Sequence, residues 1–386
     1  MDDPLAVFCP DDPAAVEAPF VFRLLRRAGL VDDGEIHGFE RSAPLSGGQS
    51  PNLLFRYSVR YRVAGQVRTA SAILKLVRVP LHSDGGGREY YFYADHFCRR
   101  LPPEVAAPVP LLVVDRPLRR QRWLWLEDCT DALPAQWTLD GLADAVRDLA
   151  ALHAHFADQQ AALLAVPWLP PDDWRADLPR RDWLLSGIER LRQHPRLRPL
   201  FTAARCALLR QVLEASEQLA TQLEQMPRTL LHNDAHGGNL GVRQRNGQRQ
   251  TVLLDWPNVA LGPFGAELAP LVSRGIVYRR FPPEQRPLLE RVALDAYCDE
   301  IARRLPGVVP ASQVWLAYDC ALLARHLSRM LGSAIRLYTE LPWWSNTEFT
   351  PEEFEQRLAV EALAWEQAAI RLGFGRGVIG RLHAAR

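Results

Sequence analysis

Apolar and polar residues alternate along much of the first third of the chain, a period of two that predicts β-strands. The clearest run puts five apolar side chains on one strand face: Leu53, Phe55, Tyr57, Val59 and Tyr61. A turn is expected at Ala64-Gly65-Gln66, with further strands and two helices around it. The strands expected after this turn are Ala70–Val79, Pro110–Asp115 and Arg122–Glu127, and the helices are Pro19–Gly29 and Arg88–Arg100.

From Leu139 onward apolar residues recur every three or four positions, which predicts amphipathic helices. After a first helix through Leu142–Phe156, the long helices expected are Phe201–Gln225, Pro283–Arg304, Ser312–Tyr338 and Pro351–Leu372. A short strand-like island, Thr229–Trp256, interrupts them. The change of period predicts an α+β protein. Its N-terminal lobe, residues 1–127, is mainly antiparallel sheet with a loose arm at 1–18, and its C-terminal lobe, residues 128–386, is mainly helical.

The composition is that of an ordinary globular protein, with 48% hydrophobic and 24% charged residues. A net charge of +1 over 386 residues gives no electrostatic footprint for nucleic acid or a membrane surface. The longest apolar stretch, Val105–Val114, is too short to span a bilayer and contains two prolines. We therefore expect neither a nucleic-acid nor a membrane partner.

The six cysteines are scattered and none forms a C-x-x-C pair, as suits a reducing compartment. The N-terminus is acidic and Pro-rich, unlike a signal peptide. These features predict a cytoplasmic protein.

The basic residues are distributed unevenly between the two types. Of 46 Lys and Arg residues, one is lysine, Lys75, so the other 45 are arginine. A coding bias toward Arg explains the surface, where either cation serves. It leaves open why one strand position keeps Lys, whose compact ammonium meets a phosphate as a point charge.

The strand-like island carries the residues best suited to chemistry. It contains HNDAHGGN at 232–239, and LLDW follows at 253–256. Phosphoryl transfer uses such a set: an Asp, an Asn five residues later, and an Asp after a short apolar strand. One carboxylate orients the acceptor hydroxyl and takes its proton, while a second carboxylate and an amide oxygen hold Mg²⁺.

HNDAHGGN followed by LLDW resembles the catalytic loop, H-G-D-x-H-x-x-N, and the metal-binding Asp of the aminoglycoside phosphotransferase and choline kinase superfamily. These are small-molecule kinases with a bilobal, protein-kinase-like fold. The resemblance implies that Asp234 is the catalytic base and that Asn239 and Asp255 are Mg²⁺ ligands. Asn233 stands where the family commonly has Gly, and Asn is the side chain that best tolerates a left-handed backbone.

Three further features extend the resemblance over about Arg41–Leu271. His232 is interpreted as a packing residue of the loop. GPFGAELA at 262–269 is similar to the family's G-D-P-x-x-D-L-A, with Glu267 in place of Asp and expected to anchor backbone. LAALHAHF at 149–156 is similar to L-A-x-L-H-x-x-F, and His153 is expected to be a packed helix residue.

In the N-terminal lobe, AILK at 72–75 resembles the V-A-I-K strand that holds ATP in such kinases. The resemblance implies that Lys75 contacts the phosphates and that Glu89, fourteen residues later, fixes its direction. The alternative for Glu89 is a solvated carboxylate at a helix start.

Two other segments are candidates for nucleotide binding. Ser46-Gly47-Gly48 lies where the family's phosphate-covering loop belongs, although the same sequence also makes ordinary turns. LWLED at 124–128 resembles the family's hinge, which implies adenine contacts to backbone around Glu127–Cys129; a plain linker is the alternative.

The resemblance implies a phosphotransferase that uses ATP, or GTP, with Mg²⁺ and modifies a hydroxyl of a small molecule such as a sugar, amino alcohol or antibiotic. A catalytically inactive nucleotide-binding regulatory module is one alternative, but Lys75, Asp234 and Asp255 are all present. A protein Ser/Thr kinase is another. Twelve residues from Asp255 to Glu267 leave little room for an activation segment.

The aromatic residues Trp168, Trp174, Tyr338, Trp343 and Trp344 are either pocket-lining or packing residues, and packing is the favoured interpretation.

Overall fold

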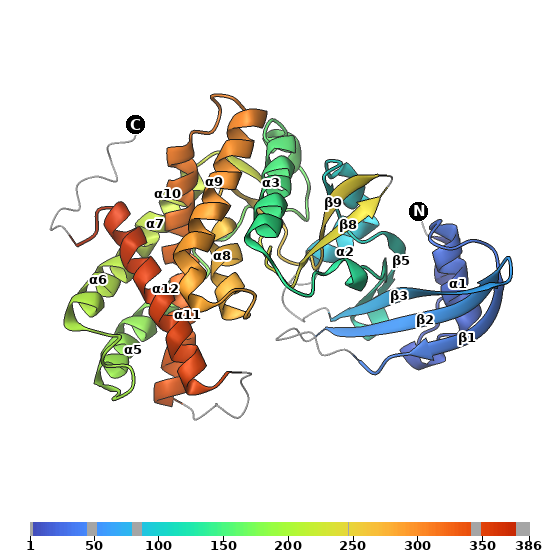
Figure 1. Cartoon of the computed structure of the whole chain (residues 1–386), viewed down its shortest axis with the longest axis horizontal. Helices are drawn as coiled ribbons and strands as arrows, with labels where there is room; N and C mark the ends of the chain where they lie inside the picture. Colours follow the sequence, from blue (N-terminus) through green and yellow to red (C-terminus); the bar gives the residue numbers. More distant parts are fainter. Residues whose placement is uncertain (1–2, 45–51, 79–86, 246, 341–348, 376–386) are drawn as a thin grey trace. The chain divides into compact units, whose positions relative to one another are not determined.

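The computed structural model describes residues 3–44, 52–78, 87–245, 247–340 and 349–375. The chain divides into two compact units (Figure 1), and each is described by itself. The first comprises Met1–Pro134 and Gly241–Asn258, and the second comprises Ala135–Leu240 and Val259–Arg386. The first unit therefore includes a late segment that lies far beyond the boundary expected at residue 127.

The first unit is built on a five-stranded antiparallel sheet in the order β1-β2-β3-β6-β5. The strands are β1 (Glu35–Arg41), β2 (Leu53–Val63), β3 (Gln66–Arg78), β5 (Pro110–Arg116) and β6 (Gln121–Glu127). A two-residue turn joins β2 to β3, where Val63 pairs with Gln66. Ala64 and Gly65 both have positive φ, 49° and 79°, as a hairpin matched to the twist of the strands requires.

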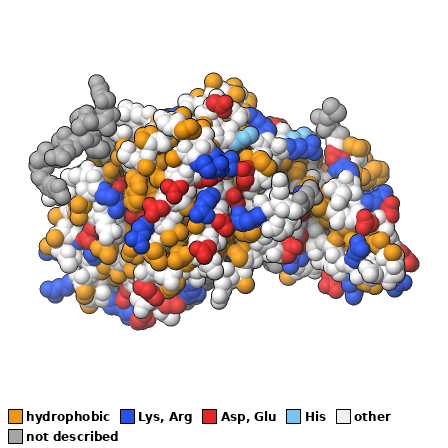
Figure 2. Space-filling view, turned by 45° about the horizontal axis from the view of Figure 1, so that its top comes forward, with side chains coloured by type: hydrophobic (Ala, Val, Ile, Leu, Met, Phe, Trp, Pro, Cys, Tyr) orange, Lys and Arg blue, Asp and Glu red, His pale blue; other side chains and the backbone are white. Residues whose placement is uncertain are grey.

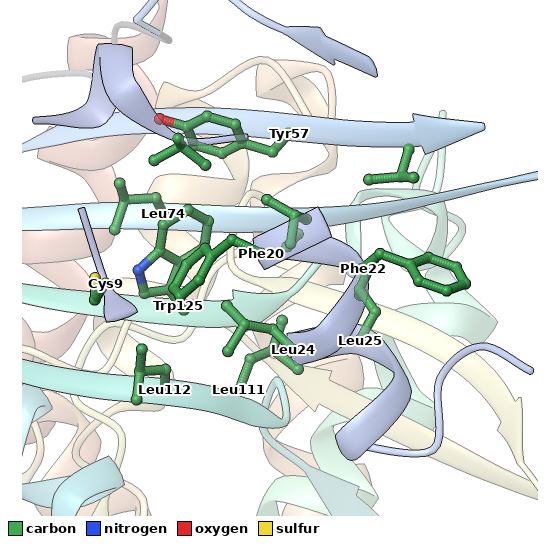
Figure 3. Close-up of a cluster of buried hydrophobic side chains, with 14 of the residues drawn as sticks. Cys9, Phe20, Phe22, Leu24, Leu25, Tyr57, Leu74, Leu111, Leu112 and Trp125 are labelled. Atoms are coloured by element: carbon green, nitrogen blue, oxygen red, sulfur yellow. The ribbon is translucent and has the colours of Figure 1, made fainter. Parts of the chain in front are cut away.

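Helix α1 (Ala18–Arg27) covers one face of this sheet (Figure 3). Its Phe20 packs edge-on against Trp125 of β6, with ring centroids 5.5 Å apart, and Trp125 also contacts Tyr57 of β2. On the central strand β3, Ala72, Leu74 and Leu76 belong to the same core. Because side chains alternate along a strand, Lys75 lies on the opposite face.

Residues 3–18, expected as a loose arm, are packed against the sheet. They form two short 3₁₀ helices, η1 (Pro4–Phe8) and η2 (Pro13–Ala15). Cys9 and Val16 are buried in the core, and the Tyr57 hydroxyl donates to the Pro13 carbonyl at 2.8 Å. The acidic and proline residues that suggested a loose arm act here as 3₁₀-helix caps and first-turn residues.

The rest of the first unit consists of short elements. They are α2 (Gly87–Ala94), η3 (Phe97–Arg100), η4 (Pro117–Arg119), η5 (Thr130–Ala132) and a three-stranded sheet of β4 (Val105–Ala106), β9 (Gln248–Leu253) and β8 (Leu240–Arg245). The helix expected over Arg88–Arg100 is divided because His96 adopts φ of 54°, outside the helical region.

The second unit is mainly helical, as expected. Its helices are α3 (Leu139–His155), α4 (Gln160–Leu164), η6 (Leu178–Arg180), α5 (Arg181–Gln193), α6 (Ala203–Glu214), α7 (Ser216–Gln225), α8 (Leu268–Val277), η7 (Pro283–Gln285), α9 (Arg286–Arg304), α10 (Ala311–Ala321), α11 (Ser328–Ile335) and α12 (Pro351–Arg371). Two strands, β7 (Arg228–Leu231) and β10 (Ala260–Pro263), pair antiparallel. The confirmed class is α+β.

The helix predicted over Ser312–Tyr338 contains two π-helical segments, η8 (Leu322–Leu327) after α10 and η9 (Arg336–Glu340) after α11. A π-helical turn is rare and frequently occurs at functional sites, because it widens the helix locally and redirects side chains. In η8 it carries Arg325, whose contacts are described below.

Basic and acidic side chains are interspersed over the face seen in Figure 2 and are not separated by sign. This distribution matches the net charge of +1. In the described part of the chain, no helix combines the length and apolar composition needed to cross a bilayer.

Candidate active site

Three of the predicted residues meet in the first unit and form what we call the lysine triad: Lys75, Glu89 and Asp255. Lys75 lies on the central strand β3 with its side chain 6% exposed. Its Nζ is 2.6 Å from the Glu89 Oε2 atom in α2, and it also donates to Asp255. The Trp256 N–H donates to the other Glu89 oxygen at 3.2 Å. Glu89 is therefore buried and paired, and it is not a solvated helix-start carboxylate.

The triad places two carboxylates around one ammonium. Burial disfavours the charged form of Lys75, but Glu89 and Asp255 outweigh it and raise the lysine pKa. Burial is the largest influence on Glu89 and raises its pKa, since Lys75 compensates only part of the charge that Glu89 and Asp255 share. Asp255 differs from its partners, because its side chain is 41% exposed and its φ is +65°. A strained, accessible carboxylate of this kind is typical of functional sites.

The predicted hinge residues also lie in the first unit. The Glu127 carboxylate accepts from the Val109 N–H and from Arg243, each at 3.1 Å, and the Glu127 N–H donates to the Val109 carbonyl at 2.9 Å. The carboxylate and the N–H of Glu127 therefore both have hydrogen-bond partners within the protein. By contrast, the N–H of the buried Cys129 makes no hydrogen bond to any other described residue. Ser46, Gly47 and Gly48 lie outside the described residues.

In the second unit, the loop at 232–239 is fixed through its backbone. Asn233 adopts φ of +64°, the left-handed conformation expected for a residue that replaces Gly. Its N–H donates to Glu267 Oε2 at 2.7 Å, which confirms that Glu267 anchors backbone. The buried His232 accepts the Asp234 N–H at 3.3 Å through Nδ1, in agreement with a packing role.

Glu267 is in turn held by a buried chain of polar groups. Its second oxygen bonds to Nε2 of His153, and the other ring nitrogen of His153 bonds to the Tyr297 hydroxyl in α9. All three side chains are buried. Burial alone would raise the pKa of Glu267, but the hydrogen bond and charge of His153 outweigh it and lower the pKa. His153 is thus packed, as expected, and it also orients the anchor of the loop.

The loop presents Asp234 and Asn239 to each other. The Asn239 amide nitrogen donates to the Asp234 carbonyl at 3.1 Å and lies 3.4 Å from its carboxylate. The amide oxygen of Asn239 accepts no hydrogen bond from the residues that the structure describes. An oxygen ligand is therefore available beside a carboxylate whose side chain is 14% exposed.

Two arginines at this loop were not anticipated. Arg274 of α8 forms an ion pair with the Asp234 carboxylate. Arg325 of η8 donates to Asn233 Oδ1 at 3.2 Å and to both Asp172 oxygens, at 2.8 and 2.9 Å. Arg274 had a usable signal, because it is the one charged residue in the sequence LAPLVSRGIV of α8. Arg325 had none, since its partners lie 92 and 153 positions away.

Of the aromatic residues singled out above, Trp174 and Tyr338 have partners within the second unit, and Trp168 is half-buried. Trp174 is 6% exposed, and the Arg325 guanidinium lies over its ring, 4.0 Å from the centroid. The Tyr338 hydroxyl donates to Glu355 at 2.8 Å. Trp343 and Trp344 lie outside the described residues.

Comparison with known proteins agrees with this architecture. A crystal structure of an aminoglycoside phosphotransferase from Alicyclobacillus acidocaldarius is 15% identical, with a TM-score of 0.53 over 94% of this chain and 96% of that one. A microcompartment-associated aminopropanol kinase is 17% identical, with a TM-score of 0.50 over 87% and 93%. An amicoumacin kinase solved with AMP-PNP and Ca²⁺ is 13% identical, with a TM-score of 0.50 over 91% and 93%. These likenesses show the protein-kinase-like fold.

The sequence itself shows the family. The model of the phosphotransferase enzyme family matches residues 44–307, which is more than half of the 386 residues. The chain belongs to this family. A search of curated proteins finds no match.

Proposed function

We propose that this protein is an ATP-dependent kinase that transfers the γ-phosphoryl group to a hydroxyl of a small molecule. Asp234 serves as the base, and Asn239 and Asp255 hold Mg²⁺. In the transfer, the acceptor oxygen bonds to the γ-phosphorus and its proton passes to Asp234. The bond from the γ-phosphorus to the bridging oxygen breaks, and ADP leaves. The observation that carries the proposal is the lysine triad, because it joins three separately predicted residues in the arrangement that nucleotide binding needs.

The nucleotide part of the proposal rests on the first unit. Lys75 is held between Glu89 and Asp255, so its ammonium has a fixed direction, as the positioning of phosphates requires. The N–H of Cys129 is a backbone donor without a protein partner among the described residues, and it suits the edge of a purine base. The Glu127 side chain is excluded from that role, because Val109 and Arg243 occupy it.

The residues proposed for Mg²⁺ fit the ion by their chemistry. Mg²⁺ takes oxygen ligands and keeps several waters, so a few protein oxygens suffice. The orientation of the Asn239 amide leaves its oxygen available, and the Asp255 carboxylate is partly exposed. When bound, the ion would neutralise charge on the phosphates.

The role proposed for Asp234 is supported by how its loop is held. The Glu267 and His232 bonds hold the N–H groups of Asn233 and Asp234, so the backbone that leads into the Asp234 side chain is fixed. Such positioning is what makes a general base effective. The segment from Asp255 to Glu267 favours a small-molecule acceptor over a protein, because β10 and its neighbours there are buried, which leaves no exposed activation segment.

The test is a phosphate-transfer screen over sugars, amino alcohols, hydroxy acids and antibiotics with Mg·ATP, with Mg·GTP in parallel. We expect transfer by the wild type and a loss of about 10²–10⁴ in turnover for Asp234→Asn, with nucleotide binding retained. Asp182→Asn is the matched control, since that side chain is 86% exposed in α5. Nucleotide binding without transfer to any acceptor would favour the inactive regulatory module.

A further inference from the structure

Resting on the proposed function, the surroundings of Asp234 restrict the chemistry of the acceptor. Arg274 forms an ion pair with this carboxylate, and Arg325 and Arg329 lie on neighbouring helical segments of the second unit. Helix α8 packs against η8, and Arg274 comes from α8 and Arg325 from η8. Arg329 of α11 lies four positions after Arg325, one helical turn away. Arg180 lies against the same helix, since a Cβ on Gly332 would fall 2.4 Å from its Nη2.

Arg325 is held by several contacts within the second unit. Both of its terminal nitrogens bind Asp172, and one also donates to the Asp173 carbonyl at 3.0 Å. Its plane is packed on the Trp174 ring. Together with its bond to Asn233, these contacts make Arg325 a positioning residue for the loop.

Arg274 and Arg329 differ from Arg325, because each has a single carboxylate partner among the described residues. The Arg274 side chain is 17% exposed, and its ion-pair partner is Asp234, the carboxylate that the proposed transfer requires. Among the described residues, Asp234 is the one carboxylate that pairs with the Arg274 guanidinium. The carboxylate nearest to Arg329 is Asp177, at 3.9 Å, and Asp177 also bonds to Arg180 at 3.3 Å.

The charges around these arginines do not balance. Asp172 is taken up by Arg325, and Arg329 shares Asp177 with Arg180. Burial, together with the like charges of Arg325 and Arg329, lowers the pKa of Arg274. An oxyanion placed beside Arg274, whose side chain is 17% exposed, would add a favourable charge interaction. A cationic group in the same place would be repelled.

We propose that the phosphate acceptor carries a carboxylate or phosphate in addition to its hydroxyl, and that Arg274 and Arg329 bind this oxyanion beside Asp234. The planar guanidinium offers paired donors that match both oxyanions. The bound anion supplies Arg274 with a partner, so that Asp234 accepts the proton of the acceptor hydroxyl. The acceptor class is therefore the hydroxy acids and phosphorylated polyols, and polycationic aminoglycosides and simple amino alcohols are excluded.

The test uses four probes built on one three-carbon diol: glycerate, glycerol 3-phosphate, neutral glycerol and cationic 3-amino-1,2-propanediol. Binding to the full chain is measured by ligand-observed NMR in saturating Mg·ADP, so that the nucleotide already fills its own phosphate contacts. We expect at least one anion to bind about tenfold or more tightly than glycerol and the amine. The stronger of the two anions shows whether a carboxylate or a phosphate is preferred.

Substitutions assign the binding to the two arginines. Arg274→Gln and Arg329→Gln should each weaken anion binding about tenfold, with glycerol binding unchanged. Arg192→Gln is the matched control, because Arg192 is a half-exposed helix residue whose carboxylate partner is 3.5 Å away. Arg329 is 52% exposed, so its variant remains testable if Arg274→Gln destabilises the fold.

Equal binding of all four probes, tighter binding of the amine, no binding of either anion, or wild-type anion binding by both variants would each overturn the inference. Its failure is distinguishable from failure of the proposed function. If neutral or cationic acceptors are phosphorylated equally well by wild type and Arg329→Gln, the kinase proposal stands and the anionic acceptor is lost. If no acceptor is phosphorylated while the anions bind through Arg274 and Arg329, the kinase proposal fails instead.

Discussion

The lysine triad of the first unit and the loop at 232–239 of the second solve the same problem, holding a charged group in place, in different ways. Lys75 is positioned by side chains of opposite charge that bind it directly. Asp234 is positioned through its backbone, because Glu267 and His232 accept the N–H groups of Asn233 and Asp234, which directly precede its Cα. The Asp234 carboxylate takes no part in this anchoring and forms an ion pair with Arg274. Direct pairing suits a group that stays charged, whereas backbone anchoring suits the role of base that we propose for Asp234.

The largest expected effects come from removing one carboxylate in each unit. Asp234→Asn and Asp255→Asn should each lower turnover about 10²–10⁴-fold, the first through loss of a base and the second through loss of a metal ligand. Only Asp255→Asn should require more Mg²⁺ for half-maximal activity. A magnesium titration of both variants checks this difference. Identical magnesium curves would remove Asp255 from the metal role.

Removing the anchor of the loop should cost stability as well as turnover. Glu267→Gln leaves His153 beside a neutral group in a buried site, and we expect a loss of about 3 kcal/mol in the free energy of unfolding. Glu267→Asp, which restores the residue usual in the family, should recover part of the lost stability and part of the lost turnover. Urea unfolding and turnover are measured on both variants. Unchanged turnover in Glu267→Gln would show that the loop is positioned by other contacts.

The two regions should respond to pH with opposite sign. Glu267 has a lowered pKa, so its contribution to the free energy of unfolding is full above its ordinary pKa of 4.5 and is lost as pH falls. Glu89 has a raised pKa, so its contribution is full below 4.5 and is lost as pH rises.

The measurement is urea unfolding between about pH 4 and pH 8 for wild type, Glu267→Gln and Glu89→Gln. The stability difference between wild type and Glu267→Gln should grow with pH, and the difference between wild type and Glu89→Gln should shrink. Slopes of the same sign would contradict the assigned pKa directions.

A smaller effect is expected from exchanging the single lysine for the cation that this chain otherwise uses. Lys75→Arg keeps the charge but places a bulky planar group between Glu89 and Asp255, where 6% of the lysine side chain is exposed. We expect about a tenfold loss of kcat/KM for ATP, measured by initial rates. If Lys75→Arg has normal activity, coding bias alone explains the basic residues of this chain, and Lys75 needs no special role. Arg68→Lys, on the same strand with a half-exposed side chain, is the control.

The smallest effect is expected at the left-handed residue of the loop. Asn233→Gly removes the 3.2 Å bond from Arg325 but adopts φ of +64° without strain, so the free energy of unfolding should change by less than about 1 kcal/mol. Asn233→Val, which disfavours this conformation, should lower stability clearly more. Thermal unfolding of the two variants compares them. Similar losses in both would assign the role of Asn233 to its side chain and not to its backbone.

Periodicity predicted those elements whose burial is one-sided. The helix at Pro19–Gly29 and the strands from Leu53 onward are amphipathic, and both are present as α1 and as β2 and β3. Strand β1 was not predicted, since its burial pattern is irregular and a bulge lies between Ile36 and Gly38. Helix α5 was also not predicted, although Leu184, Ile188 and Leu191 carry a helical spacing that was available in the sequence.

The sequence alone determined the family of this protein, because motifs such as HNDAHGGN, LLDW and AILK keep their residue types in short, fixed spacings. Family membership and the candidate residues follow from those spacings. Only the tertiary structure decided what surrounds them. Arg274 and Arg325 reach the loop from helices that follow it by dozens of residues, and Glu89 meets Trp256 across 167 positions. Such pairings are set by packing, which no local pattern encodes. The anionic acceptor that we propose rests on the contacts of Arg274, which the motifs do not contain.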